Sequence, residues 1–200
     1  MAGALDGPRA EVAGSAAFVA SGVGMKTILA FALLAGSFCA VATAADGGVT
    51  PPDVPAALRA PAGQGAFLVA FAKGVQIYEC VAKADTPAAF EWKLSGPEAV
   101  LADASGKPIG KHFAGPTWQA NDGSAVVGEV RARDAGPSAS AIPWLLLAAK
   151  NTTGNGLLSA TKSIQRVDTV GGIAPVDPCG AAQAKQVARV AYSAKYYFYR

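Results

Sequence analysis

The chain has 200 residues, with 17 basic and 14 acidic side chains and a formal net charge of +3. The basic residues are scattered instead of forming one patch, so we expect no nucleic-acid partner. A chain of this length is one domain, or one domain preceded by a leader.

Residues 25–44 have the layout of a secretory signal peptide. A positive start at Met25-Lys26 is followed by an apolar run over 28–38 and by the small-residue cleavage site Ala42-Thr43-Ala44. The apolar run is too short for a membrane-spanning helix, so we expect no membrane span after the leader is cleaved. We interpret residues 1–24 as a mis-called N-terminal extension. The mature protein is therefore expected in the bacterial periplasm or secreted.

The cysteines fit that compartment. Cys39 would leave with the leader, and the mature chain would keep Cys80 and Cys179. In an oxidising environment two cysteines form a disulfide more often than they remain free. The sequence therefore predicts a bond between Cys80 and Cys179.

The rest of the chain divides into an arm and a series of strands. Residues 45–64 are rich in Pro and Gly and predict an extended arm. Residues 65–200 contain short apolar or alternating segments between Gly/Pro breaks, and no long amphipathic helix; only 181–188 could form a helical turn or two. The segments are 67–71, 75–81, 90–94, 99–102, 125–130, 142–149, 161–170 and 190–199. This spacing predicts a monomeric, single-domain, all-β fold, either an antiparallel β-sandwich or a small β-barrel with short strands.

One hairpin can be predicted in detail. Asn121-Asp122-Gly123 is a turn signal, because Gly tolerates the positive φ that such turns need. A three-residue loop places Trp118 opposite Val126 and separates an apolar face from a polar one. In this register Trp118 points inward, and Arg131 and Arg133 point outward.

Two further segments have informative patterns. The run over 142–149 is continuously apolar, which predicts a strand buried on both faces or a short core helix. The segment 190–199 alternates, so Tyr192, Tyr196 and Phe198 share one face.

Several motifs occur in an order that resembles a known family. They are Gly115-Pro-Thr-Trp118, Asp122-Gly-Ser124, Ile142-Pro-Trp-Leu-Leu-Leu147, Ile164-Gln-Arg-Val-Asp-Thr169 and Tyr192-Ser-Ala-Lys-Tyr-Tyr-Phe-Tyr199. With these motifs the chain resembles the family called domain of unknown function 3455 (DUF 3455). The resemblance covers about residues 50–200 and implies a secreted single-domain protein. It carries no activity, substrate or catalytic residue over to this chain.

His112 is the only histidine, and its unperturbed pKa would lie near neutral pH. It precedes the hairpin that carries Trp118, so we expect the two side chains to face one ligand pocket. His112 and Asp122 are the candidate catalytic residues, with His112 as a general base. A lone His and scattered carboxylates predict no metal site. The glycines at 154 and 156 fit no phosphate-binding spacing, so no cofactor is expected.

Three functions are consistent with these observations. The first is a binding module for a small apolar or saccharide ligand near Trp118 and His112. The second is a small hydrolase or lyase, and the third is a structural or stress-related envelope protein without a pocket. The sequence has no nucleophile motif, and a paired cysteine cannot attack a substrate. Binding is therefore the preferred hypothesis over catalysis.

Overall fold

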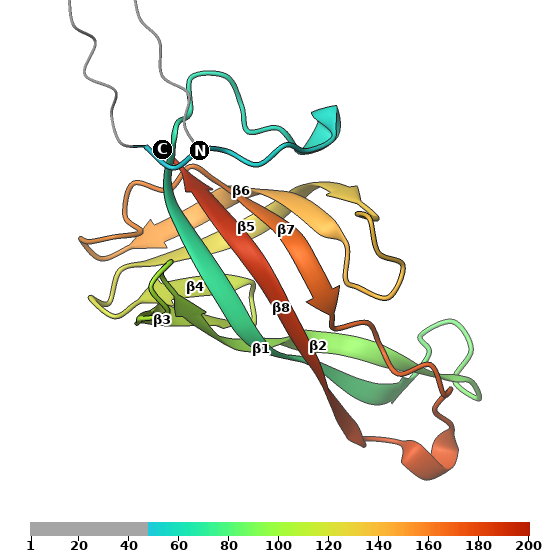
Figure 1. Ribbon diagram of the computed structural model, residues 1–200. Helices are drawn as coiled ribbons and strands as arrows, with labels where there is room; N and C mark the ends of the chain where they lie inside the picture. Colours follow the sequence, from blue (N-terminus) through green and yellow to red (C-terminus); the bar gives the residue numbers. More distant parts are fainter. Residues whose placement is uncertain (1–47) are drawn as a thin grey trace, which may run out of the picture. The chain divides into compact units, whose positions relative to one another are not determined.

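The computed structural model describes residues 48–200 (Figure 1). The expected extension, the signal peptide with its cleavage site, Cys39 and the first residues of the arm lie outside the described residues. Within residues 48–200, no helix is long and apolar enough to cross a membrane.

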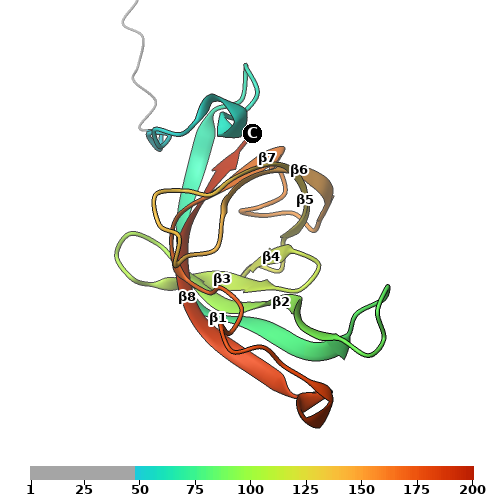
Figure 2. The same ribbon diagram turned by 90° about the vertical axis from the view of Figure 1, so that its right-hand side faces the viewer.

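Eight antiparallel strands form one closed barrel. Each strand pairs with the next in the sequence, and β8 returns to pair with β1, which closes the ring (Figure 2). The all-β antiparallel prediction is confirmed, and the barrel is the architecture observed. The strands are β1 (Ala66–Ala82), β2 (Phe90–Ala102), β3 (Pro108–Phe113), β4 (Thr117–Ala120), β5 (Ala125–Asp134), β6 (Trp144–Thr153), β7 (Ser163–Gly171) and β8 (Val187–Tyr199).

Several strands are longer than the short segments that the sequence predicts. The segments 67–71 and 75–81 belong to one strand, β1. The segments 90–94 and 99–102 belong to β2, which passes through Gly96-Pro97 without a turn. A register shift opposite Ile77 and Tyr78 leaves Ser95 unpaired there. The Gly-Pro signal therefore marks a β-bulge, where a strand tolerates both residues, and not the end of a strand.

The predicted hairpin register is confirmed. Trp118 pairs with Val126, and the loop closes through a hydrogen bond from the Gly123 amide to the Ala120 carbonyl (3.0 Å). Gly123 has φ +87°, as the turn requires. Trp118 is 1% exposed, and Arg131 lies on the outside, where it pairs with Glu129 (2.8 Å).

The predicted orientation of Arg133 is wrong. A second register shift lies between Val130 and Ala132, so that strict alternation is interrupted there. Beyond it Ala132 packs on the outer face, and Arg133 turns to the inner face, where it lines the cavity while remaining exposed to solvent. An extra residue in one strand turns all later side chains to the opposite face.

The Pro-rich arm covers part of the outer surface. It contains the short 3-10 helix η1 (Ala56–Leu58), whose Leu58 is fully buried against β5, β6 and β7. Val54, Leu58 and Val167 form this outer cluster, with Ala132, Trp144, Leu146 and Tyr197 packed against it. The Gln165 side-chain amide donates to the Leu58 carbonyl at 2.6 Å.

The arm explains the continuously apolar run of β6. Leu145 and Leu147 point into the barrel, while Trp144 and Leu146 lie under the arm. The prediction of a strand buried on both faces is therefore confirmed.

One end of the barrel is closed by a loop. Leu158, in the β6–β7 loop, is 2% exposed and packs in the main core with Phe198 and Leu101. Asp122 holds this loop, because its carboxylate accepts hydrogen bonds from the Leu157 amide (2.7 Å) and from the Ser124 amide (2.9 Å).

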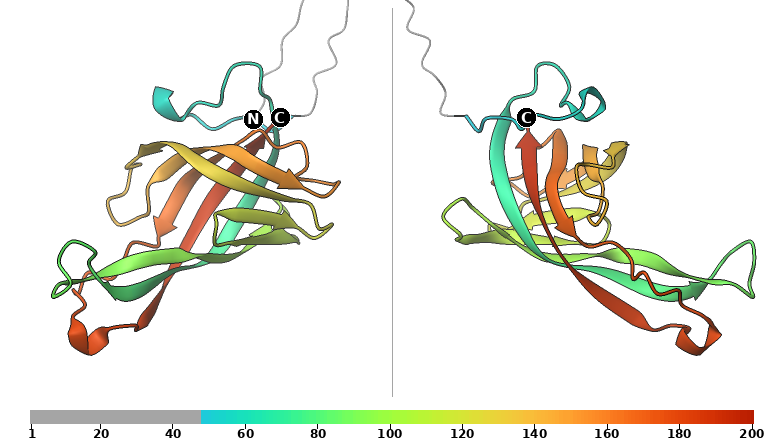
Figure 3. Two further views of the ribbon diagram at one scale, coloured as in Figure 1. Left: turned by 180° about the vertical axis from the view of Figure 1, so that it is seen from behind. Right: turned by 45° about the vertical axis from the view of Figure 1, so that its right-hand side comes forward.

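At the other end β1, β2 and β8 extend beyond the ring (Figure 3). The disulfide Cys80–Cys179 confirms the predicted pairing, and it ties the β7–β8 loop to β1. The Trp92 indole also donates to the Asp177 carbonyl of this loop (3.0 Å). The expected helical turns reduce to a short 3-10 helix, η2 (Ala181–Gln183), and β8 begins at Val187.

Candidate functional site

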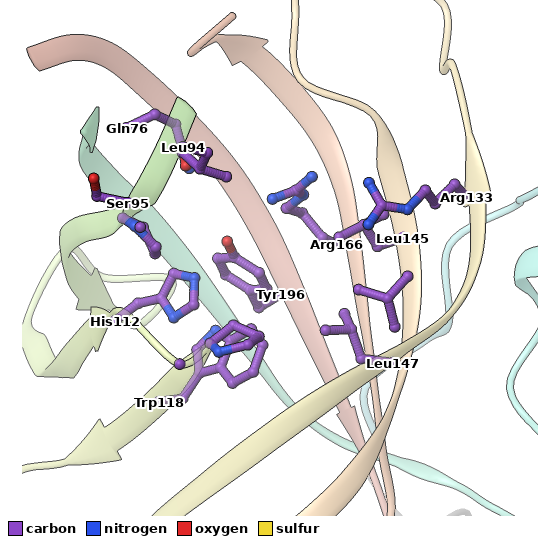
Figure 4. A pocket seen from close by; sticks show the side chains of 15 residues that line it. Gln76, Leu94, Ser95, His112, Trp118, Arg133, Leu145, Leu147, Arg166 and Tyr196 are labelled. Carbon is purple, nitrogen blue, oxygen red and sulfur yellow. The ribbon is translucent and has the colours of Figure 1, made fainter. Parts of the chain in front are cut away.

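A cavity of about 250 Å³ occupies the barrel interior toward the end opposite Leu158. Fifteen residues from β1–β8 and their loops line it, and Figure 4 shows their side chains. Leu94 and Ser95, at the β2 bulge, are exposed and lie at its rim, and Pro97 and Pro116 also line it. His112 and Trp118 line one side, and Arg133 and Arg166 line the other (Figure 4).

His112 and Trp118 lie directly against each other. Their rings stack with centroids 4.3 Å apart and planes inclined by 10°. Tyr196 meets both rings edge-on, at 5.0 Å from His112 and 5.2 Å from Trp118. The two residues that the sequence singled out are thus brought to one cavity. Whether a ligand contacts them stays a prediction.

A missing side chain makes room for the indole. A Cβ at Gly128 would lie 2.9 Å from Cζ3 of Trp118 and 3.0 Å from Cδ2 of Leu147. Glycine at this position therefore lets the indole of Trp118 approach the backbone of β5 closely.

His112 lies at the end of β3, as its second-last residue, and its side chain is only 2% exposed. Burial lowers the pKa of His112 to about 3, although its hydrogen bond to the Thr117 carbonyl opposes this effect. The ring is therefore neutral at pH 7. Nδ1 must carry the proton, because it lies 2.8 Å from the Thr117 carbonyl, and Nε2 is left as an acceptor.

Asp122 lies apart from this cavity. It is not among the residues that line the cavity, and its carboxylate is engaged with Ser124 and Leu157. These bonds, first of all the one from the Ser124 hydroxyl, hold the pKa of Asp122 below its usual value. Asp122 thus has a structural role at the closed end, and the structure does not pair it with His112.

The sequence did not reveal most of the polar groups in the cavity. Gln76 on β1, Arg133 on β5, Arg166 on β7 and Tyr196 on β8 all line it. Arg166 shares its face of β7 with the buried Ile164, two residues earlier. Side chains two residues apart in a strand share a face, so a buried Ile164 would have placed Arg166 in the interior. The sequence did not show which face of this strand is buried.

Four buried polar atoms near the cavity have no hydrogen-bond partner in the described part of the chain. They are Nε2 of Gln76, Nε1 of Trp118 and the hydroxyls of Tyr192 and Tyr196. Burial raises the pKa of Tyr196, with Arg166 opposing, so the hydroxyl stays protonated and able to donate. Buried polar groups are normally paired, so an unpaired group at a cavity wall requires an explanation.

A metal site is not formed by these residues. Among residues 48–200, no group of three or more His, Cys, Asp or Glu side chains is close enough to hold a metal ion.

Fold and site together define an eight-stranded up-and-down barrel with an interior cavity toward one end and a loop closing the other. The chain belongs to the family described as Protein of unknown function (DUF3455), whose sequence profile matches residues 61–200. No curated protein and no solved structure matches the chain.

Proposed function

We propose that this protein is a binding module that takes a small organic molecule into the barrel cavity. Barrels of eight strands have an interior wide enough for one small ligand. The observation that carries the proposal is the set of unpaired polar atoms on Gln76, Trp118 and Tyr196 beside apolar Leu145 and Leu147. A ligand with an apolar body and a few polar atoms would satisfy these groups.

Binding explains the site better than catalysis. A histidine whose pKa is near 3 is a weak general base at neutral pH. Asp122 is engaged at the closed end and does not orient the imidazole. The cavity itself favours binding over a purely structural role, because a small barrel without a ligand would be expected to fill its interior with side chains.

We further propose that the protein acts outside the cytoplasm, in the periplasm or secreted. The signal-like residues 25–44 and the Cys80–Cys179 bond support this location, because disulfides persist in oxidising compartments.

The binding proposal is tested with N-phenyl-1-naphthylamine, an uncharged fluorophore whose emission rises in apolar surroundings. We expect saturable binding of one molecule per chain. Val130→Trp and Leu94→Trp, which place an indole in the cavity or at its rim, should each reduce the affinity at least about tenfold, a change of about 1.4 kcal/mol.

Val100→Trp is the matched control, because Val100 is 53% exposed on the outside of β2. It should leave binding unchanged. If both cavity variants fold, as judged by circular dichroism, and still bind the fluorophore like the wild type, the cavity is not the binding site.

A further inference from the structure

Two arginine side chains line one side of the cavity without an acidic partner. Arg133 comes from the end of β5, and Arg166 comes from β7 (Figure 4). None of the lining residues is Asp or Glu. The ion pairs found in residues 48–200 join other side chains, namely Arg131–Glu129, Arg189–Glu98 and Lys195–Asp168. The cavity therefore contains positive charge that no acidic side chain of residues 48–200 neutralises through an ion pair.

The guanidinium of Arg166 is held in a fixed position. Its Nε and one Nη donate to the Pro143 carbonyl at 3.1 and 2.8 Å. A guanidinium has five N–H donors in a rigid plane, so the remaining N–H groups stay available to a ligand. Its charge also reaches the interior, because Arg166 affects the pKa of His112, of Tyr192 and of Tyr196.

The other polar groups are mostly donors. The Trp118 indole N–H, the Gln76 amide and the Tyr196 hydroxyl have no acceptor among the described residues. A cavity with this balance is complementary to a ligand whose polar end consists of acceptors. Leu145, Leu147 and Val130 provide the apolar wall beside it.

We infer that the ligand is a small organic carboxylate, with its carboxylate between Arg133 and Arg166 and its apolar body against Leu145, Leu147 and Trp118. Arginine is suited to this role because its planar fork matches the two carboxylate oxygens. The cavity volume of about 250 Å³ limits the ligand to a compact molecule. This inference rests on the proposed binding function, and it names the chemical class of the ligand.

The test compares 2-naphthoate with its uncharged analogue 2-naphthamide by titration calorimetry on the folded protein. We expect the carboxylate to bind at least about tenfold more tightly than the amide. Arg133→Gln and Arg166→Gln should each weaken naphthoate binding about tenfold or more and weaken naphthamide binding clearly less, because the amide carries no charge and offers the guanidinium a single carbonyl oxygen. Arg166→Lys, which keeps the charge but not the planar fork, should fall between Arg166→Gln and the wild type.

Arg131→Gln is the matched control. Arg131 lies two residues from Arg133 but on the outer surface, so its loss should change neither affinity. Arg133 is exposed and makes no ion pair within residues 48–200, so Arg133→Gln is expected to fold even if Arg166→Gln does not.

The outcomes separate the two proposals. If the amide binds as tightly as the carboxylate, or Arg133→Gln has no effect, the anion inference fails and cavity binding stands. If inorganic phosphate displaces naphthoate at equal concentration, the arginine pair selects phosphate-type anions, and the carboxylate assignment is overturned. If neither naphthoate nor N-phenyl-1-naphthylamine binds, the binding function fails as well.

Discussion

The imidazole of His112 lies flat on the indole of Trp118, and both rings are almost completely buried. This contact joins β3 to β4 inside the barrel, where the two residues are also paired in register. It makes His112 a packing residue as well as a cavity residue. Replacing His112 is therefore expected to reduce stability.

The buried neutral His112 predicts a pH-dependent stability. Its pKa is about 3 in the folded protein, whereas an unperturbed histidine has a pKa near 6.5, so the unfolded chain binds the proton more readily. Stability from this residue is complete above the unfolded pKa and falls as the pH decreases below it. Between about pH 7.5 and about pH 5 the free energy of unfolding should drop by about 2 kcal/mol from His112 alone. Urea unfolding at several pH values measures this drop.

His112→Gln is the control for that experiment, because glutamine does not titrate. Its free energy of unfolding should depend less on pH in this window, whatever its absolute value. Equal pH dependence in the wild type and the variant would contradict the assigned neutral state of His112.

Loss of the disulfide should destabilise the domain. The bond joins residues separated by 99 positions, and the chain-entropy model gives about 4–5 kcal/mol for a loop of about this length. The double variant Cys80→Ala/Cys179→Ala is therefore expected to unfold at lower urea concentration. Intact-mass measurement with alkylation, with and without reductant, should find no free thiol in the oxidised wild type. Two alkylated thiols without reductant would show that the bond is absent.

The arm should contribute to stability through Leu58. This side chain is fully buried against the outer face of the barrel, so Leu58→Ala should cost about 2–5 kcal/mol. Ala57→Ser, in the same 3-10 helix but exposed, is the control and should change little. Thermal unfolding compares the two. If Leu58→Ala unfolds like Ala57→Ser, the arm does not stabilise the barrel.

Gly123 should be sensitive for a conformational reason alone. A Cβ there would meet no atom within 4 Å, but the residue has φ +87°, which L side chains rarely adopt. Gly123→Val should therefore destabilise by about 1 kcal/mol or more. Gly65→Val is the matched control, because Gly65 also has open space and lies outside the positive-φ region. Equal unfolding free energies for the two variants would contradict the turn geometry.

Local sequence signals predicted the parts of this fold that depend on short-range geometry. Gly123 determined the turn, and the alternation around Trp118 and Val126 then determined the register. The alternation of β8 correctly placed Tyr192 and Tyr196 on one buried face. The disulfide was predicted because the expected mature chain keeps only two cysteines and is expected in an oxidising compartment.

The residues that line the cavity could not be predicted from local sequence patterns, because their orientation depends on β-bulges. The bulge after Val130 reverses the orientation of Arg133, and the bulge at Ser95 keeps β2 continuous at the rim. On β1 the buried face carries Gln76 and Tyr78, whereas the apolar Val75 and Ile77 point outward. In this part of β1 the more polar residues face the interior, so a prediction from hydrophobicity assigns the wrong face of the strand to the interior.

The cavity of this protein depends on the pairing of β8 with β1, because that pairing closes the barrel. The barrel closes through the pairing of Ala66 with Tyr199, so its closure depends on contacts between the first and the last strand of the domain. Without β8 the sheet would keep two open edges, on β1 and on β7, and Tyr196 would be missing beside His112 and Trp118. The wall of the cavity is therefore complete only when β8 pairs with both β1 and β7.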